Sequence, residues 1–410
     1  MEQFLEKAKS ASRILATMAG NERNRILREM AESLRANTMN ILEANAVDMR
    51  RAQEENLATS LKERLLLDEK RIDAMAVAIE EIAALKDPIG RVLEGWVTEA
   101  GLKIEKVSIP IGVIGIIYES RPNVTSDTAA LCFKSSNGCV LKGGKEAELS
   151  NIAIAEVLQA VLTRNNLPKE LIALLPDSSR EGVAKLIKMD RYVDLIVPRG
   201  GEGLIRYVSQ NSSVPVVKHD KGLCHTFIHS EANIENAIAI ALNAKVQRPG
   251  VCNSMETLLV DERIAPTLLP ILKEAFDHAH TELKGCDLTR EIVDVAEATE
   301  EDFDTEYLAN ILNIRVVDGV EGAIGHIVRF GSGHSEAIIT ENITIAERFM
   351  DAIDAAAVYV NASTRFTDGG AFGFGAEVGI STNKLHARGP MGVEGLTTYK
   401  YKVYGKGQIR

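Results

Sequence analysis

The sequence predicts an α/β protein built on a doubly wound parallel sheet, and three features of the chain lead to this prediction. Short apolar runs alternate with amphipathic stretches from residue 109 onward, the pattern of strands that are each followed by a helix. Glycine-containing turns follow two of these runs, as in folds that bind dinucleotides. With 410 residues, the chain is too long for one core, so we expect two or more domains.

The N-terminal part is expected to be helical up to about residue 86, because apolar residues recur there at spacings of three and four with charges on the other face. Residues 92–108 break this pattern. They contain short β-prone pieces with Gly95 and Gly101 between them, which predicts a small two-stranded arm.

Strand and helix units then follow in order. Helices are expected from residue 126 and over residues 146–162, and buried strands at residues 113–118, 139–142, 171–175, 194–197, 214–218 and 226–228. Parallel strands that are covered on both faces read as continuous apolar runs, and these runs do.

A second αβ block begins near residue 231. Helices are expected at residues 233–244 and 266–276, and strands at residues 256–260, 313–317, 337–340 and 357–361. The last stretch is glycine-rich from residue 368 and β-like at residues 397–403. We therefore predict a dinucleotide-binding domain over residues 1–228 that includes the arm, a second α/β domain over 229–360, and a return to the first domain over 361–410.

Composition excludes several classes of function. The net charge of −11 argues against nucleic acid as the main partner. We find no apolar run near the roughly 20 residues that span a bilayer and no secretory signal, so we expect a cytoplasmic protein that does not bind membranes. Five cysteines without a CxxC pair predict reduced thiols rather than disulfides or a zinc site.

The most informative segment is residues 247–255, QRPGVCNSM, in which Cys252 lies in a turn containing Gly and Pro that leads into a strand. A cysteine in such a turn can be exposed at a cleft, and its thiolate can form a thioester that accepts hydride. The alternative is an incidental or buried cysteine. From the turn alone, both interpretations stay open.

Two further loops have the character of dinucleotide contacts. Residues 141–146 (LKGGKE) and 198–203 (PRGGEG) each follow a strand and open a helix, so backbone groups can approach a ligand there. Neither matches GxGxxG, and each can equally be a tight connection. Asn123 can present an amide to an oxyanion, although most asparagines in such places are turn residues.

Taken together, these segments resemble the aldehyde dehydrogenase superfamily, and more closely its gamma-glutamyl phosphate reductase family, over essentially the whole chain. The sharpest markers are residues 118–125, 247–253, 331–336 and 389–396, and residues 320–338 resemble the reductase signature. Phe330 stands where that family usually has His or Tyr. The resemblance implies an aldehyde-dehydrogenase-like fold with a cofactor domain, a catalytic domain that carries the nucleophilic cysteine, and a small β oligomerisation arm that the C-terminal strand completes.

The resemblance also implies roles for single residues. They are Cys252 as the nucleophile, Asn123 with the Cys252 backbone N–H as the oxyanion hole, Lys142 on the adenosine ribose, Gly200 and Gly201 beside the dinucleotide, and Glu306 on the nicotinamide ribose.

Two departures from ordinary aldehyde dehydrogenases bear on the chemistry. Residues 217–222 (VKHDKG) lack the glutamate that activates water in those enzymes, so a thioester should survive to meet hydride or phosphate. Lys145 stands where NAD-using relatives often have a glutamate. A cation there should attract a 2′-phosphate, which predicts NADPH/NADP⁺ as the cofactor.

The implied reaction is the reduction of L-glutamyl 5-phosphate to L-glutamate 5-semialdehyde and phosphate, the second step of proline biosynthesis from glutamate, with no metal. Arg121 and Arg248 are candidates for the anionic groups of the substrate, and Ser335 and Glu336 for its amino-acid end. We also expect a homo-oligomer and transient contact with glutamate 5-kinase. The alternatives are another aldehyde dehydrogenase that oxidises a small aldehyde, and a catalytically silent member of the superfamily.

Overall fold

The structure is a computed structural model of the chain that describes residues 1–217 and 221–410. The chain forms two compact units. The first contains Met1–Lys218, Gly373–Gly379 and Pro390–Arg410, and the second contains His219–Phe372 and Ile380–Gly389. Each unit has a parallel sheet of its own with helices packed on it, which confirms the predicted α/β fold class.

The first unit begins with the predicted run of helices. These are α1 (Glu2–Leu15), α2 (Gly20–Ala36), α3 (Thr38–Glu54), α4 (Thr59–Leu65) and α5 (Glu69–Ala84). Their apolar stripes are buried; in α2, for example, Ile26, Leu27 and Met30 have no exposed surface. Asp68 caps α5 by accepting a hydrogen bond from the Arg71 backbone N–H.

The sheet of the first unit has four parallel strands in the order β5-β4-β3-β6. Its elements are β3 (Val113–Tyr118), α6 (Asn123–Lys134), β4 (Gly138–Lys142), η1 (Lys145–Ala147), α7 (Glu148–Arg164), η2 (Lys169–Leu171), β5 (Ile172–Leu174), α8 (Arg180–Leu186), β6 (Leu195–Arg199) and α9 (Glu202–Asn211). Every residue of β3 and β4 is buried, as expected for strands covered on both faces. Helix α6 begins three residues earlier than predicted, because Pro122 is preorganised for a helix start.

The strand predicted at residues 214–218 is wrong for the described residues. Only Val216 bridges Ile196, because Pro215 has no N–H to continue the ladder, and Lys218 lies outside the described residues. The prediction that the first domain extends to residue 228 also needs correction. Strand β7 (Cys224–Ile228) pairs with strands of the second sheet.

The second unit contains seven parallel strands in the order β10-β9-β11-β8-β7-β12-β13. Its other elements are α10 (Ile234–Val246), β8 (Met255–Asp261), α11 (Ala265–His278), β9 (Glu282–Gly285), α12 (Asp287–Ile292), β10 (Ala296–Glu297), α13 (Glu300–Phe303), β11 (Ile311–Val317), α14 (Gly319–Phe330), β12 (Ser335–Ile339), α15 (Ile343–Ala352), β13 (Ala357–Val360) and η3 (Thr364–Phe366). Successive residues of a strand face opposite sides, so Leu258 packs with α10 and α11 while Leu259 packs with α14 and α15.

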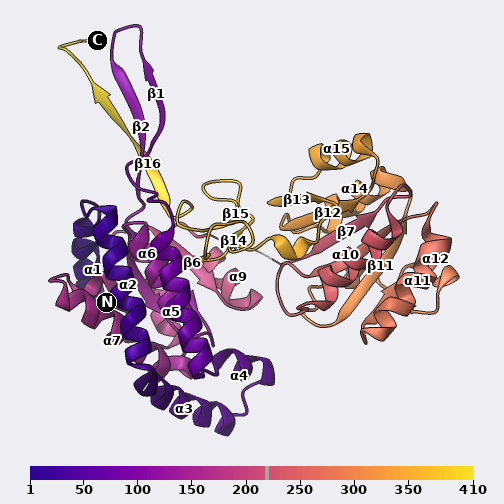
Figure 1. The fold of residues 1–410 in the computed structure, drawn as a ribbon, viewed down its shortest axis with the longest axis horizontal. Helices are drawn as coiled ribbons and strands as arrows, with labels where there is room; N and C mark the ends of the chain where they lie inside the picture. The colour runs from indigo at the N-terminus through magenta and orange to yellow at the C-terminus, as the bar shows by residue number, and fades with distance from the viewer. Residues whose placement is uncertain (218–220) are drawn as a thin grey trace. The chain divides into compact units, whose positions relative to one another are not determined.

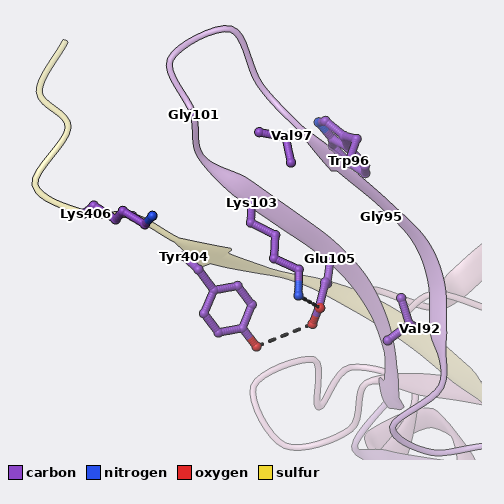
Figure 2. Close-up of a pocket in the computed structure, with 10 residues that line it drawn as sticks. Val92, Gly95, Trp96, Val97, Gly101, Lys103, Glu105, Tyr404 and Lys406 are labelled. Carbon is purple, nitrogen blue, oxygen red and sulfur yellow. Dashed lines mark hydrogen bonds and ion pairs between the residues drawn. The ribbon is translucent and has the colours of Figure 1, made fainter.

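The predicted arm is present and extends from the first unit (Figure 1). Strands β1 (Val92–Val97) and β16 (Thr397–Tyr404) pair antiparallel with opposite edges of β2 (Lys103–Pro110). Figure 2 shows Lys103 and Tyr404 reaching Glu105, at 2.7 and 3.4 Å, beside a surface cavity of about 660 Å³. Large apolar residues remain exposed along the arm, namely Val92, Leu93, Trp96, Val97, Tyr401 and Val403.

The remaining strands, β14 (Ile380–Ser381) and β15 (Gly389–Pro390), form a two-stranded sheet. The predicted return to the first domain over residues 361–410 is divided, because residues 361–372 and 380–389 belong to the second unit. Among the described residues, no helix is both long and apolar enough to cross a membrane.

Candidate active site

Cys252 lies in the loop that joins α10 to β8, and it is half-exposed. The backbone of Gly222 runs directly against this residue. A Cβ on Gly222 would lie 2.1 Å from the Cys252 carbonyl oxygen and 2.6 Å from its Cα, distances that side chains do not reach. The loop that carries the cysteine, residues 247–254, therefore lies against glycine, and we call it the nucleophile loop after the role expected of Cys252.

Asn253 fastens the nucleophile loop to the segment around η3. Its Nδ2 donates to the carbonyl oxygens of Thr367 at 2.8 Å and of Arg365 at 3.3 Å. The hydroxyl of Thr364 donates to the Asn253 carbonyl oxygen at 2.8 Å. These residues are more than 100 positions apart in the chain, so the fold alone brings them together.

A buried thiol contacts the other side of the loop. Cys224, the first residue of β7, donates its S–H to the Cys252 carbonyl oxygen at 3.2 Å. Burial raises the pKa of the Cys224 thiol well above its ordinary value, and the charge of Glu336 raises it further, so this thiol stays protonated. Cys224 thus supports the loop as a neutral thiol.

The positions of Ser335 and Glu336 correct the prediction that they bind the substrate. Both side chains have no exposed surface. Oε2 of Glu336 accepts a hydrogen bond from the His225 backbone N–H and lies 2.9 Å from His225 Nδ1. The hydroxyl of Ser335 lies 2.6 Å from that of Thr367. These residues hold β12 to β7 and to η3, inside the unit, where a substrate does not reach.

An ion pair that was not predicted lies beneath the nucleophile loop. Nζ of Lys245, at the end of α10, donates to Oε2 of Glu256 at 2.8 Å, and both side chains are fully buried. Burial raises the pKa of Glu256 to about 7, although Lys245 opposes the shift, and burial lowers the pKa of Lys245. A charged residue in an otherwise apolar helix or strand is a signal that could have identified this pair.

Glu306 lies near this pair, in the connection between α13 and β11. Its negative charge contributes to the raised pKa of Glu256, and the Leu308 backbone N–H reaches Oε1 of Glu256 at 3.4 Å. The Leu308 carbonyl oxygen lies 3.5 Å from a Cβ built on Gly250. The segment with Glu306 therefore lies against the nucleophile loop, and Glu306 itself is half-buried.

In the first unit, Lys142 ends β4, is almost fully buried and donates to the Ser178 carbonyl oxygen at 2.7 Å. Burial lowers its pKa, which nearby carboxylates, Glu146 first, oppose. A Cβ on the next residue, Gly143, would lie 2.2 Å from Nδ2 of Asn151. Glycine at this turn therefore leaves room for the Asn151 side chain.

A cavity of about 650 Å³ opens beside this turn. Its volume is in the range of pockets that bind small molecules. It is lined by Gly143, Gly144, Glu148, Asn151, Ile152, Ala155, Leu174, Leu175, Pro176 and Ser178, together with residues of α1, η2 and the rest of α7.

Gly200 and Gly201 form the turn between β6 and α9. Oε2 of Glu119, just after β3, accepts a hydrogen bond from the Gly201 N–H at 2.9 Å, and a Cβ on Gly200 would lie 2.6 Å from the same oxygen. The carboxyl ends of β3, β4 and β6 thus meet at one edge of the sheet, which is where doubly wound folds bind dinucleotides. Glu119 was not predicted.

Asn123 is the first residue of α6, and its side chain is exposed. Its Nδ2 donates to Oδ2 of Asp127 at 2.9 Å. Burial raises the pKa of Asp127 to about 6, while Asn123, Ser126 and Arg199 oppose the shift. Arg121, two residues before Asn123, is half-buried in the turn between β3 and α6.

Two further predictions concern Lys145 and the segment of residues 217–222. Lys145 lies on η1, with Nζ 3.2 Å from Oε2 of Glu55 and both side chains exposed. The segment without a water-activating glutamate includes Lys218, His219 and Asp220, which lie outside the described residues. Among the residues that are described, no group of three or more His, Cys, Asp or Glu is arranged to hold a metal ion.

Comparisons with known proteins give a consistent result. The model of the "Aldehyde dehydrogenase family" matches residues 1–284. A gamma-glutamyl phosphate reductase of Sulfurovum sp. is 78% identical over 410 residues, which cover 100% of both chains. The crystal structure of gamma-glutamyl phosphate reductase from Thermotoga maritima is 47% identical with a TM-score of 0.97, covering 100% of this chain and 99% of that one. An acetylating aldehyde dehydrogenase from Geobacillus thermoglucosidasius shares the fold, at 22% identity and a TM-score of 0.72, over 100% and 97% of the two chains.

Proposed function

The chain belongs to the aldehyde dehydrogenase family and, within it, to the gamma-glutamyl phosphate reductases, and we propose that it reduces L-glutamyl 5-phosphate to L-glutamate 5-semialdehyde with NADPH through a thioester on Cys252. It is an oxidoreductase. The observation that carries the thioester proposal is a half-exposed cysteine on a loop that Gly222, Asn253 and Cys224 hold from three directions.

In the proposed mechanism, the Cys252 thiolate attacks the γ-carbonyl carbon and phosphate leaves, which produces the thioester. The Cys252 backbone N–H and the Asn123 amide donate to the oxyanion, a type of contact typically worth about 10²–10³ in rate. NADPH, when bound, supplies the hydride that reduces the thioester carbon. The resulting thiohemiacetal then collapses, returns the thiol to Cys252 and releases the aldehyde.

The residues of the first unit fit a nicotinamide dinucleotide, the cofactor of this family. Lys142 would hold the adenosine ribose beside the cavity at Gly143, and the turn at Gly200 and Gly201 would approach the phosphates. The Gly201 N–H is occupied by Glu119, so that hydrogen bond would have to open for the phosphates to use it. Glu306 of the second unit would hold the nicotinamide ribose.

The preference for NADPH rests on Lys145. Its ion pair with Glu55 is exposed and therefore weak, so the ammonium group can exchange a carboxylate for a 2′-phosphate at little cost. The fate of the thioester rests on residues 217–222, which carry no glutamate to activate water. Hydride or phosphate, rather than water, should then remove the acyl group.

We further propose a cytoplasmic homo-oligomer in which a second copy covers the arm. A three-stranded arm with exposed Trp96, Tyr401 and Val403 does not bury its apolar surface alone. Transient contact with glutamate 5-kinase would transfer the labile acyl phosphate. Sedimentation at equilibrium tests the first proposal, because a monomer at micromolar concentration would contradict it.

The reverse reaction tests the proposed function as a whole. The purified protein should reduce NADP⁺ with L-glutamate 5-semialdehyde only when phosphate or arsenate is present. Oxidation of a simple aldehyde without phosphate would instead support an ordinary aldehyde dehydrogenase. No turnover in either assay would support a silent member of the superfamily.

Changing Cys252 tests the covalent step. Cys252→Ala should lower the rate by at least about 10⁴-fold, as loss of a nucleophile does. Cys286→Ala is the matched control, because Cys286 is also half-exposed in the second unit, while its thiol lies 3.3 Å from the Thr289 hydroxyl and packs against the core rather than on the nucleophile loop. Mass spectrometry during turnover should find a glutamyl adduct on Cys252, and retained activity in Cys252→Ala would overturn the thioester.

A further inference from the structure

The arginines of the second unit fall into two groups. Each of those far from the nucleophile loop forms an ion pair with a carboxylate, namely Arg263, Arg290, Arg315, Arg329, Arg348 and Arg388. In the described part of this unit, Arg248 and Arg365 alone form no ion pair. Arg365 is half-buried and Arg248 is exposed. A cation is rarely left without an anion in a partly buried place, so Arg365, whose pKa also responds to the charge of Arg248, points to an anionic ligand.

The fold holds Arg365 at the nucleophile loop, 113 positions after Cys252 in the sequence. Its Nε donates to Oε1 of Gln247 at 3.1 Å, the residue just before Arg248. Its carbonyl oxygen accepts from Asn253, the residue just after Cys252. Arg365 is therefore fastened at both ends of the loop, and its guanidinium keeps donors that no carboxylate within ion-pair distance uses.

The electrostatics agree with this placement. Burial is the largest cause that lowers the pKa of Arg365, and the charge of Arg248 lowers it further. The Cys252 thiolate and Asp368 act in the opposite direction. Burial and the repulsion from Arg248 both act against the charge of the Arg365 guanidinium, and an anionic substrate group between the two arginines would offset both.

We propose that Arg365, together with Arg248, forms the site that holds the phosphoryl group of the acyl phosphate substrate beside Cys252, an inference that rests on the proposed function. Arginine binds phosphate through two parallel N–H donors and remains charged at every physiological pH. Holding the phosphoryl group places the carbonyl carbon at the thiol. The same contacts stabilise the charge that collects on phosphate as the C–O bond breaks, and they bind inorganic phosphate in the reverse reaction.

The test is a phosphate titration of the reverse reaction at saturating L-glutamate 5-semialdehyde and NADP⁺. Arg365→Ala should raise the KM for phosphate roughly 10- to 100-fold, the usual effect of losing a charge-assisted pair of hydrogen bonds, and leave the KM for the aldehyde nearly unchanged. Arg365→Lys should give a smaller rise because it keeps the charge but loses the planar fork. Arg348→Ala, in an exposed ion pair with Glu321, is the control and should change neither.

A second measurement needs no turnover. Inorganic phosphate should protect Cys252 of the wild-type protein from iodoacetamide, and Arg365→Ala should lose this protection. A variant that raises the KM for the aldehyde but not for phosphate would overturn the proposal, as would unchanged protection. If the wild-type protein shows no phosphate-dependent turnover, the proposed function fails, while the protection assay still decides whether Arg365 binds phosphate. Gln247→Ala, which releases only Nε of Arg365, serves if Arg365→Ala does not fold, and it should weaken the protection severalfold.

Discussion

The candidate site residues of each unit lie at one edge of that unit's own parallel sheet, and the edge differs between the two units. In the first unit, the candidate cofactor residues follow the carboxyl ends of β3, β4 and β6, where helices begin. In the second unit, the nucleophile loop and its supports precede the amino ends of β7, β8 and β12, where helices end. At the first edge, backbone N–H groups and helix dipoles favour anions, but at the second edge they do not.

This difference explains which residues each edge needs. The first edge contains glycines, Gly143 and Gly200, that leave room for the side chains of Asn151 and Glu119. The second edge receives the C-terminal end of α10, whose dipole disfavours a thiolate, so side chains must hold the loop and supply positive charge. Asn253 holds the loop, and we propose that Arg248 and Arg365 supply the positive charge.

The largest effect on stability is expected at the buried ion pair of the second unit, Lys245 and Glu256. Glu256→Leu leaves Lys245 without its partner and should destabilise the protein by about 3–5 kcal/mol, measured as the free energy of unfolding in urea. The double variant Lys245→Met/Glu256→Leu removes both charges and should recover most of that loss. If the double variant is no more stable than the single one, the buried pair is not the cause.

The next prediction compares a glycine that lies against backbone with a glycine that lies against side chains. Gly222→Ala forces a methyl group into the Cys252 backbone, so the rate should fall roughly 100-fold while cofactor affinity is kept, since a misplacement of about 1 Å can cost that much. Gly143→Ala meets side chains rather than backbone, those of Asn151 and Tyr118, and should instead raise the KM for the cofactor.

Gly325→Ala, in α14, is the control for both glycine variants, because nothing lies within 4 Å of its added methyl group. Steady-state kinetics give the rate and the KM for each variant. Equal rate losses in Gly222→Ala and Gly325→Ala would remove the argument for a close approach at Cys252.

A smaller effect concerns the carboxyl group that holds Asn123 in the first unit. Burial raises the pKa of Asp127 to about 6, above its unfolded value, so its contribution to stability is present in acid and is lost as the pH rises through about 6. Relative to wild type, Asp127→Asn should gain up to about 2 kcal/mol between pH 4 and pH 7, because the carboxyl is only half-buried. Unfolding curves that stay parallel over this range would show that Asp127 titrates normally.

The smallest effect is expected at Lys145, the exposed candidate cofactor residue of the first unit. Lys145→Glu should shift the preference from NADPH toward NADH by about 10-fold, as a single exposed charge can. The ratio of kcat/KM for the two cofactors measures it, with Lys169→Glu, at the cavity rim on η2, as a comparison. An unchanged ratio would remove Lys145 from the cofactor site.

Much of the fold could be predicted because its signals are local. The strands at residues 113–118 and 313–317 are apolar runs of ordinary length, and both were located from the sequence. Sheet membership could not be predicted at residues 224–228, because an apolar run does not say with which strand it will pair. The same limit explains why the apolar run at residues 214–218 predicts a strand, although Pro215 lacks the N–H that would continue the ladder.

By itself, the sequence determined the fold class and the family. It also determined that Cys252 lies in a turn before a strand and that Lys142 ends a strand, because each of these depends on residues that are adjacent in the chain. The tertiary structure decided that Glu336 is buried against His225, that Gly222 supports Cys252 and that Arg365 reaches the nucleophile loop. These contacts join residues that are 30 to more than 100 positions apart. Burial and charge pairing depend on which surfaces meet in space, and spacing along the chain does not contain that information.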